Sequence, residues 1–371
     1  MRSEDDLFKR NLFGSLRLVL ASLVVFGHVW VVNHWLTGTW DPISRIKIQD
    51  LGTGQVAVVG FFSVSGFLIS GSSRRNPAKG FVLLRAGRLL PGYWLMLVIV
   101  TVLFEPILFL LVHGSLAGLP IFGGESLMSY LFKNLFLLQL QSSIPGVVAH
   151  GMQTRVNGSA WSLEYEAFCY LVVATFVFLC RKFRITGWTW IASAVIALVM
   201  FLARLSMSLH ILKYHAFTLA PLTVYFGAFF LCYTIGCFEV RWLTHPGVRI
   251  AAPVLLVALV SLNLWNVWGE FLFPICILTI GAYAGGRRSS EVGRRVDLSY
   301  GIYLFAWPIQ QMLSAKHVLV NEPYLDFLLA LLLVLPVAAL SWFLIERPSL
   351  KAAHRKASSI RATSLLLTTS T

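Results

Sequence analysis

The sequence predicts an all-α integral membrane protein, a bundle of about ten transmembrane helices with both termini in the cytoplasm. Hydrophobic residues make up 57% of the 371 residues and charged residues only 12%, whereas soluble domains carry about 25% charged residues. One water-soluble core of this size cannot bury so much apolar sequence. The apolar residues also come in runs of about 20, the length that a helix needs to cross the hydrocarbon core. Short basic clusters separate these runs, as in multi-pass membrane proteins.

The apolar runs define the candidate spans, which are residues 12–33, 53–71, 91–113, 163–181, 188–207, 216–237, 248–267, 271–285, 299–316 and 325–346. An amino terminus in the cytoplasm puts most of the Lys and Arg residues on the cytoplasmic side, as the positive-inside rule requires. We expect residues 1–350 to form one transmembrane domain and the Ser/Thr-rich residues 351–371 to be a disordered cytoplasmic tail. The largest outer segment, 114–162, contains an amphipathic stretch at 127–140. That stretch is expected to lie along the interface and cover an outward-facing opening.

The net charge of +14 does not indicate a nucleic-acid partner. The basic residues lie in short groups between apolar runs, such as Arg74, Arg75 and Lys79, and form no basic stripe. The five cysteines lie in apolar stretches without metal-ligand spacing. We therefore expect neither a disulfide framework nor a metal site.

Two ionisable residues, Arg17 and His28, interrupt the first apolar run. Each costs roughly 2.5 to 3.5 kcal/mol inside a span unless it faces a cavity or a partner. Their spacing returns a helix to nearly the same face about 16 Å further along. We expect the pair to line one cavity, with Arg17 near its cytoplasmic mouth and His28 at or beyond its middle. Alternatively, Arg17 snorkels to the interface and His28 only bonds to a neighbouring helix.

The fourth span begins after Asn157 with Trp161, Ser162, Glu164 and Glu166. The two glutamates lie about 200° apart around a helix, so at most one of them faces the same cavity. We favour Glu166, which lies deeper and shares a face with Ser162. Alternatively, both are interfacial acids stabilised by the dipole at a helix amino terminus.

Arg85 and Arg88 precede Pro91 on the cytoplasmic side of the third span. Their spacing puts them on one helical face, and Pro91 suits the first turn of the following helix. Paired guanidinium groups at the cavity mouth suit phosphate binding. The positive-inside rule alone also explains them.

Two further spans carry polar groups. The second contains Ser65 in a Ser-x-Ser-Gly group, which indicates close helix packing more than a nucleophile. In the ninth, Tyr300 and Tyr303 share a face, and Pro308 is expected to kink or locally break the helix.

Together these segments resemble the membrane acyltransferase-3 family, bacterial O-acyltransferases that modify surface polysaccharides and other glycans. The motifs follow in order: Arg-x10-His, Phe-Phe-x-x-Ser-Gly-Phe-Leu, Arg-x-x-Arg-x-x-Pro-x-Tyr, Asn-x-x-x-Trp-Ser-Leu-x-x-Glu, Ser-Tyr-Gly-Ile-Tyr-Leu and Ile-Glu-Arg-Pro. Each is weak alone, but their common order over nearly the whole chain is specific. One departure is Ala306, where many members carry a His. We infer that this position tunes the pocket or the acceptor.

The resemblance implies a multi-pass O-acyltransferase of the bacterial cytoplasmic (inner) membrane, among membrane lipids. Acetyl-CoA or another acyl-CoA would be a co-substrate, with no permanently bound cofactor, and a glycan or lipid-linked saccharide hydroxyl would be the acceptor. Arg17, Arg85 and Arg88 would bind the donor, with Arg17 nearest the reacting end. His28 would act as general base or acyl carrier, and Glu166 would orient its imidazole. Substrate binding or structural support would come from Ser65, Asn157, Trp161, Ser162, Tyr300 and Tyr303.

Two other function classes stay open. A transporter or flippase of a polar or glycan substrate also has many spans and buried charge, but it usually has an internal repeat, and none is visible here. In a scaffold protein the polar residues would only hold helices together. Neutral substitutions would then perturb folding before any activity.

Overall fold

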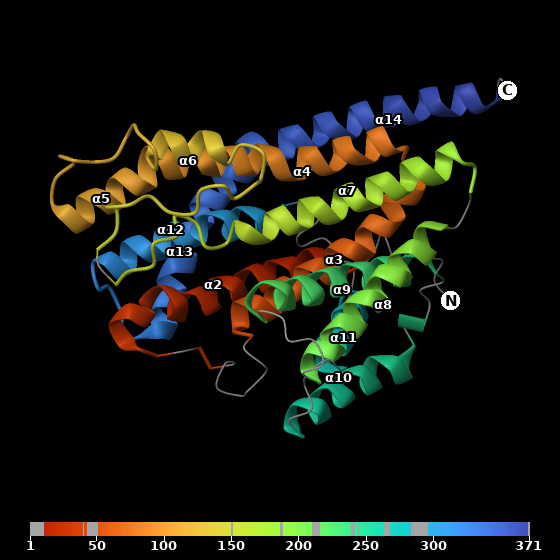
Figure 1. Ribbon diagram of the computed structural model, residues 1–371, viewed down its shortest axis with the longest axis horizontal. Coiled ribbons are helices and arrows are strands. Elements are labelled where there is room, and N and C mark those ends of the chain that lie inside the picture. The colour runs from red at the N-terminus through yellow and green to blue at the C-terminus, as the bar shows by residue number, and fades with distance from the viewer. Residues whose placement is uncertain are drawn as a thin grey trace.

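The computed structural model is a bundle of helices whose axes run mainly along its longest dimension (Figure 1). It describes residues 11–39, 41–42, 51–149, 151–185, 188–209, 216–238, 242–243, 245–262, 268–282 and 296–369. Apart from one isolated bridge between Ser143 and Arg155, these residues form helices, turns and loops.

The first half of the bundle comprises α2 (Phe13–Thr37), α3 (Thr53–Arg75), α4 (Ala78–Ile99), the π-helix η2 (Val100–Phe104), α5 (Glu105–His113), α6 (Leu127–Lys133) and α7 (Trp161–Lys182). The second half comprises α8 (Trp188–Ser208), α9 (Ala216–Cys237), α10 (Pro246–Ser261), α11 (Glu270–Ala282), α12 (Ser299–Ala315), α13 (Pro323–Ser341), the π-helix η5 (Trp342–Glu346) and α14 (Arg347–Thr369).

Every predicted span overlaps one of these helices, and six helical segments are long and apolar enough to cross a membrane by length and composition. The protein is therefore an all-helical integral membrane protein. The count of ten spans and the cytoplasmic position of both ends stay predictions.

Helix α3 lies at the centre of the bundle, between α2 and α9, and 78% of its most apolar window is buried. Gly66 permits the close approach of α9, because a Cβ there would lie 2.1 Å from the backbone oxygen of Phe229. On the side of α3 away from α9, α2 packs in turn against α12, and α12 packs against α13. These contacts fix the depths of the polar residues on α2, α3 and α12 relative to one another.

The third span starts earlier than predicted. Helix α4 begins at Ala78, so that Arg85 and Arg88 lie within the helix and Pro91 is an internal proline. Arg85 and Arg88 share a helical face, as predicted, but this face belongs to the span itself and lines an interior pocket. The helix α12 likewise continues through Pro308.

The segment expected to be a disordered tail is helical. After η5, α14 continues the chain as a helix that lies along α4 (Figure 1). Small residues bring the two together, since a Cβ on Gly87 of α4 would lie 2.6 Å from the Cβ of Ala353, which is 6% exposed. The Ser/Thr content suggested disorder, but these small residues allow close packing of two helices.

In the outer segment between α5 and α7, the described residues form one helix, α6. The amphipathic stretch predicted at 127–140 therefore ends as a helix at Lys133. The end of this segment is fastened to α12, where the Trp307 indole donates to the oxygen of Arg155 at 3.0 Å and Gln311 donates to that of Gln153 at 2.9 Å.

Candidate functional site

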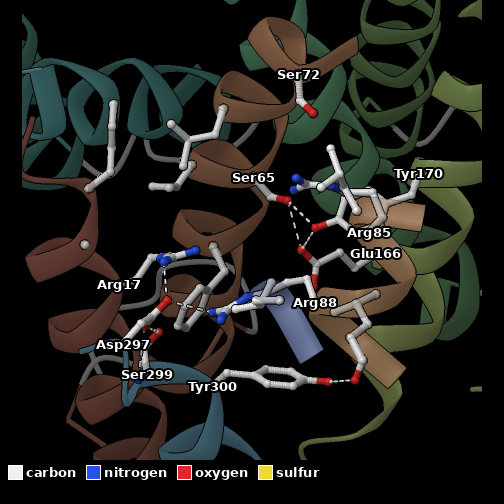
Figure 2. Close-up of a pocket in the computed structure, with 18 of the residues that line it drawn as sticks. Arg17, Ser65, Ser72, Arg85, Arg88, Glu166, Tyr170, Asp297, Ser299 and Tyr300 are labelled. Atoms are coloured by element: carbon white, nitrogen blue, oxygen red, sulfur yellow. Dashed lines mark hydrogen bonds and ion pairs between the residues drawn. The ribbon is translucent and has the colours of Figure 1, made fainter. Parts of the chain in front are cut away.

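A cavity of about 710 Å³ opens between α2, α3, α4, α7, α12 and α14 (Figure 2). It gathers most of the predicted site residues, namely Arg17, Ser65, Arg85, Arg88, Ser162, Glu166, Tyr300 and Tyr303. On α3 its lining runs from Val58 to Arg75, a distance of about 25 Å at 1.5 Å per residue. The pocket is therefore elongated along the bundle.

Asp297 joins two of the predicted arginines (Figure 2). Its carboxylate accepts hydrogen bonds from Arg17 and, at 2.8 Å, from Arg88. It also accepts from the Ser299 hydroxyl at 2.5 Å. Burial raises the pKa of Asp297, but the two guanidinium groups and Ser299 outweigh burial and hold that pKa below its usual value. Asp297 is therefore ionised and balances part of the charge of Arg17 and Arg88.

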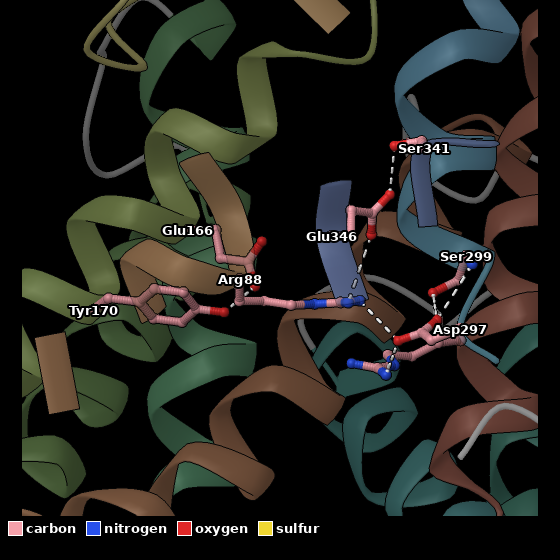
Figure 3. Close-up of polar contacts among 8 residues, drawn as sticks. Arg88, Glu166, Tyr170, Asp297, Ser299, Ser341 and Glu346 are labelled. Carbon is pink, nitrogen blue, oxygen red and sulfur yellow. Dashed lines mark hydrogen bonds and ion pairs between the residues drawn. The ribbon is translucent and has the colours of Figure 1, made fainter. Parts of the chain in front are cut away.

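Arg88 also approaches a second acid. Its Nη1 lies 3.8 Å from the Oε2 of Glu346, and the Ser341 hydroxyl donates to the other carboxylate oxygen at 2.7 Å (Figure 3). Glu346 belongs to η5, and π-helical turns are frequent at functional sites. The Arg88 guanidinium carbon lies 5.3 Å from the ring centroid of Tyr300. Arg88 is thus held on three sides.

Arg85 has different surroundings. Its Nε is buried without a hydrogen-bond partner, and no ion pair joins it to another described residue. Its guanidinium carbon lies 5.9 Å from the ring centroid of Tyr170. Arg85 therefore lines the pocket without an ion pair to a described residue, whereas Arg88 is paired.

Glu166 binds two hydroxyl groups on the pocket wall. Ser65 Oγ donates to its Oε1 at 2.9 Å, and the Tyr170 hydroxyl donates to the same atom. The two hydroxyl oxygens lie 2.8 Å apart (Figure 2). This network connects α3 to α7. Among the described residues, the side-chain partners of Ser65 are Glu166 and Tyr170, and no histidine is placed to activate it as a nucleophile.

His28 lies elsewhere and does not line the pocket. Its half-buried ring meets Trp307 edge-on, with centroids 4.8 Å apart, and its Nδ1 is buried without a hydrogen-bond partner. Beside it on α3 is Gly54, where a Cβ would lie 3.9 Å from His28 Cδ2. The innermost α3 lining residue, Val58, is about one helical turn from Gly54. The pocket thus ends about one turn short of His28.

Glu166 does not orient the His28 imidazole in this structure. Its partner Ser65 lies eleven residues after Gly54 on α3, which separates the two levels by about 16 Å. We expected Glu166 beside His28 on the premise that α2 and α7 place their polar residues at the same level along the bundle axis. The structure instead sets Glu166 at the level of the arginines.

The remaining predicted residues support the wall. The Tyr303 hydroxyl donates to the Ser159 backbone oxygen at 2.7 Å and lies 2.6 Å from Ser162 Oγ. Asn157 donates to the backbone oxygen of Leu304 at 2.8 Å. Neither Asn157 nor Trp161 lines the pocket, and Trp161 packs its ring 5.2 Å from that of Tyr225.

Ala306 lies in the core of α12. It is 1% exposed and does not line the pocket. The inference that this position tunes the pocket or the acceptor has no direct contact in this structure to support it.

Asp297, Glu346 and Tyr170 are among the residues of the site that were not predicted. Asp297 lies two residues before Ser299, the first residue of α12. An acidic residue just before a helix is the sequence signal that could have singled it out. Glu346 lies in the Ile-Glu-Arg-Pro motif, but no role was assigned to it. Tyr170 lies one helical turn after Glu166 on α7. Among the described residues, no group of three or more His, Cys, Asp or Glu is placed to hold a metal ion.

Comparison with known proteins matches residues 13–346 to the acyltransferase-3 family model, described as an acyltransferase domain. The chain is 26% identical over 355 residues to an O-acetyl transferase of Shigella phage Sf6, covering 92% of this chain and 96% of that protein. It is 28% identical over 380 residues to nodulation protein 10 of Rhizobium leguminosarum bv. viciae, covering 94% and 95%. No solved structure matches the chain.

Proposed function

Since this chain belongs to the acyltransferase-3 family, we propose that it moves an acyl group, taken as acetyl, from cytoplasmic acyl-CoA to a hydroxyl of a carbohydrate or lipid-linked saccharide. The family and the similarity to an O-acetyl transferase make it an acyltransferase, with an acyl donor and an acceptor as substrates. We propose in addition that the donor is acyl-CoA, that the acceptor is a saccharide and that the protein lies in the bacterial inner membrane.

The shape and charge of the pocket carry the proposal. Five arginines line it against two carboxylates, Glu166 and Asp297, so its lining is positively charged overall. An acyl-CoA is a long molecule with phosphates at one end and the thioester at the other. A basic pocket about 25 Å long that ends one turn from His28 suits such a donor.

His28 is the group best suited to meet both substrates. Its Nδ1 has no partner among the described residues, so an acceptor hydroxyl could donate to it. In direct transfer, the hydroxyl oxygen attacks the thioester carbonyl carbon, the carbon–sulfur bond breaks, and His28 takes the proton and passes it to the departing thiolate. Arg85 binds the donor phosphates, while Arg17 and Arg88 form the inner basic wall with Asp297.

Replacement of His28 by Gln tests this function. The wild type and the variant are expressed in a bacterial host that lacks the activity, and purified surface glycans are analysed by mass spectrometry. We expect added acyl mass with the wild type and none with His28→Gln, at equal amounts of membrane protein. His34→Gln is the matched control, since it makes the same change on the same helix, away from Trp307.

Two outcomes would contradict the proposal. Wild-type transfer by His28→Gln would remove His28 from the reaction. Failure of the purified wild type to bind CoA in titration calorimetry would remove the proposed donor and favour the transporter.

A further inference from the structure

Glu166 presents one carboxylate oxygen to the donor pocket. Its Oε1 accepts the hydrogen bonds from Ser65 and Tyr170. Its Oε2 has no hydrogen-bond partner among the described residues, and it is not enclosed by neighbouring atoms. Because Glu166 lines the pocket, this oxygen is an acceptor left free for a ligand.

Two helices hold this carboxylate. Ser65 belongs to α3 and Tyr170 to α7, and their hydroxyl oxygens lie 2.8 Å apart. Each hydroxyl has a proton to donate, so both can bind the same carboxylate oxygen. The side chain of Glu166 is thus oriented before any ligand arrives, which reduces the entropy that binding costs.

Arg85 lies on one side of Glu166 (Figure 2). Its guanidinium carbon lies 5.9 Å from the ring centroid of Tyr170, which follows Glu166 by about 6 Å along α7. Both Arg85 and Glu166 line the pocket, and no ion pair joins them. Glu166 therefore lies about one helical turn from the residue proposed to bind the donor phosphates.

On the other side lies the end of the pocket that is nearest to His28. Gly158 comes just before α7, and a Cβ there would lie 2.5 Å from the ring of Trp307, which meets His28. Along the chain, Glu166 comes between Gly158 and the turn of α7 beside Arg85. A donor that extends from Arg85 toward His28 therefore passes Glu166.

In CoA, the pantetheine arm joins the diphosphate to the thiol. This arm is uncharged and carries a hydroxyl group and amide N–H groups. A carboxylate oxygen accepts hydrogen bonds from such groups but repels a phosphate. We propose that Glu166 Oε2 binds a hydroxyl or amide N–H of the pantetheine arm, so that Glu166 is a donor-binding residue and Ser65 and Tyr170 are its positioning residues. This rests on the proposed function.

The test compares CoA with adenosine 3′-phosphate 5′-diphosphate, which has the nucleotide and the diphosphate but no pantetheine arm. Their dissociation constants for the purified full-length protein are measured by titration calorimetry. Glu166→Gln keeps an oxygen for Ser65 and Tyr170 and replaces Oε2 by an amide nitrogen that cannot accept. It should raise the dissociation constant of CoA at least tenfold. The dissociation constant of the nucleotide should stay the same or fall, because a negative charge near the diphosphate is lost.

Two further variants sharpen the test. Glu164→Gln is the matched control, because it makes the same change on the same helix at a residue that does not line the pocket. It should bind both ligands like the wild type. Tyr170→Phe keeps the ring beside Arg85 but removes one hydroxyl from Glu166. It should weaken CoA binding and leave nucleotide binding unchanged.

Three outcomes would overturn the role of Glu166 in donor binding. The first is an equal loss of affinity for both ligands in Glu166→Gln, which a merely structural role would produce. The second is wild-type CoA affinity in that variant, and the third is equal binding of the two ligands by the wild type. Absence of any CoA binding by the wild type would overturn the proposed donor instead, so the two failures are distinguishable.

Discussion

Arg85 and Arg88 are three residues apart on α4, yet replacing them should have different effects. Arg85→Ala should weaken CoA binding with little loss of stability, because Arg85 has no ion partner among the described residues. A hydrogen bond to a charged group contributes about 1.5 to 3 kcal/mol. That corresponds to a dissociation constant roughly 10- to 150-fold higher. Arg85→Lys, which keeps the charge but not the paired donors, should fall between Arg85→Ala and the wild type.

Arg88→Ala should chiefly destabilise the protein. Asp297 and Glu346, with side chains 6% and 1% exposed, would both lose their contact with Arg88. Breaking a buried ion pair on one side costs about 3 to 5 kcal/mol. We expect the lower end of that range, because Asp297 keeps Arg17 and the Arg88 side chain is 15% exposed.

The assay measures CoA affinity by calorimetry and the thermal midpoint in the same detergent for Arg85→Ala, Arg88→Ala and the wild type. Wild-type CoA affinity in Arg85→Ala would refute a role of Arg85 in donor binding. An equal loss of thermal midpoint in Arg85→Ala and Arg88→Ala would refute the difference in pairing between the two arginines.

Two more substitutions test other parts of the structure. Gly158→Ala should slow acyl transfer at least tenfold with unchanged CoA affinity, because its Cβ would lie 2.5 Å from the Trp307 ring and displace that ring from His28. Glycan mass spectrometry beside calorimetry measures this, and normal transfer would disprove it. Glu270→Gln should lower unfolding stability by about 3 kcal/mol or more, because Glu270 accepts two hydrogen bonds from Arg204, at 2.7 and 2.8 Å. CoA affinity should persist, and an unchanged thermal midpoint would count against the pair.

The sequence predicted which residues line the pocket more accurately than it predicted how far along the bundle axis each of them lies. Ionisable residues in apolar runs are costly unless they face a cavity, so Arg17 and Glu166 could be assigned to an interior site. Helical spacing then gave the face on which each lies. The depth of one helix relative to another depends on loop lengths and side-chain fit. The partner of Glu166 was therefore expected to be His28, but it is Ser65 together with Tyr170.

Partners distant in sequence were also missed. Arg17 and Asp297 are 280 positions apart, and no local pattern joins them.

The helix α14 was missed for a different reason. Its Ser/Thr content favours disorder when considered alone, whereas on α4 Gly87 leaves room for Ala353 and Gly80 lies beside Ala357.

The ion cluster around Asp297 also has a consequence for biosynthesis. Arg17 leaves the ribosome 280 residues before its carboxylate partner, which takes about 15 to 60 s at translation rates of roughly 5 to 20 residues per second. Throughout that interval the nascent chain holds arginines that lack their counter-charge, and the wall formed by α14 does not yet exist. A chain released early would therefore be a poorly folded substrate for quality-control proteases. The pocket becomes complete only when α14, the last helix, has packed against α4.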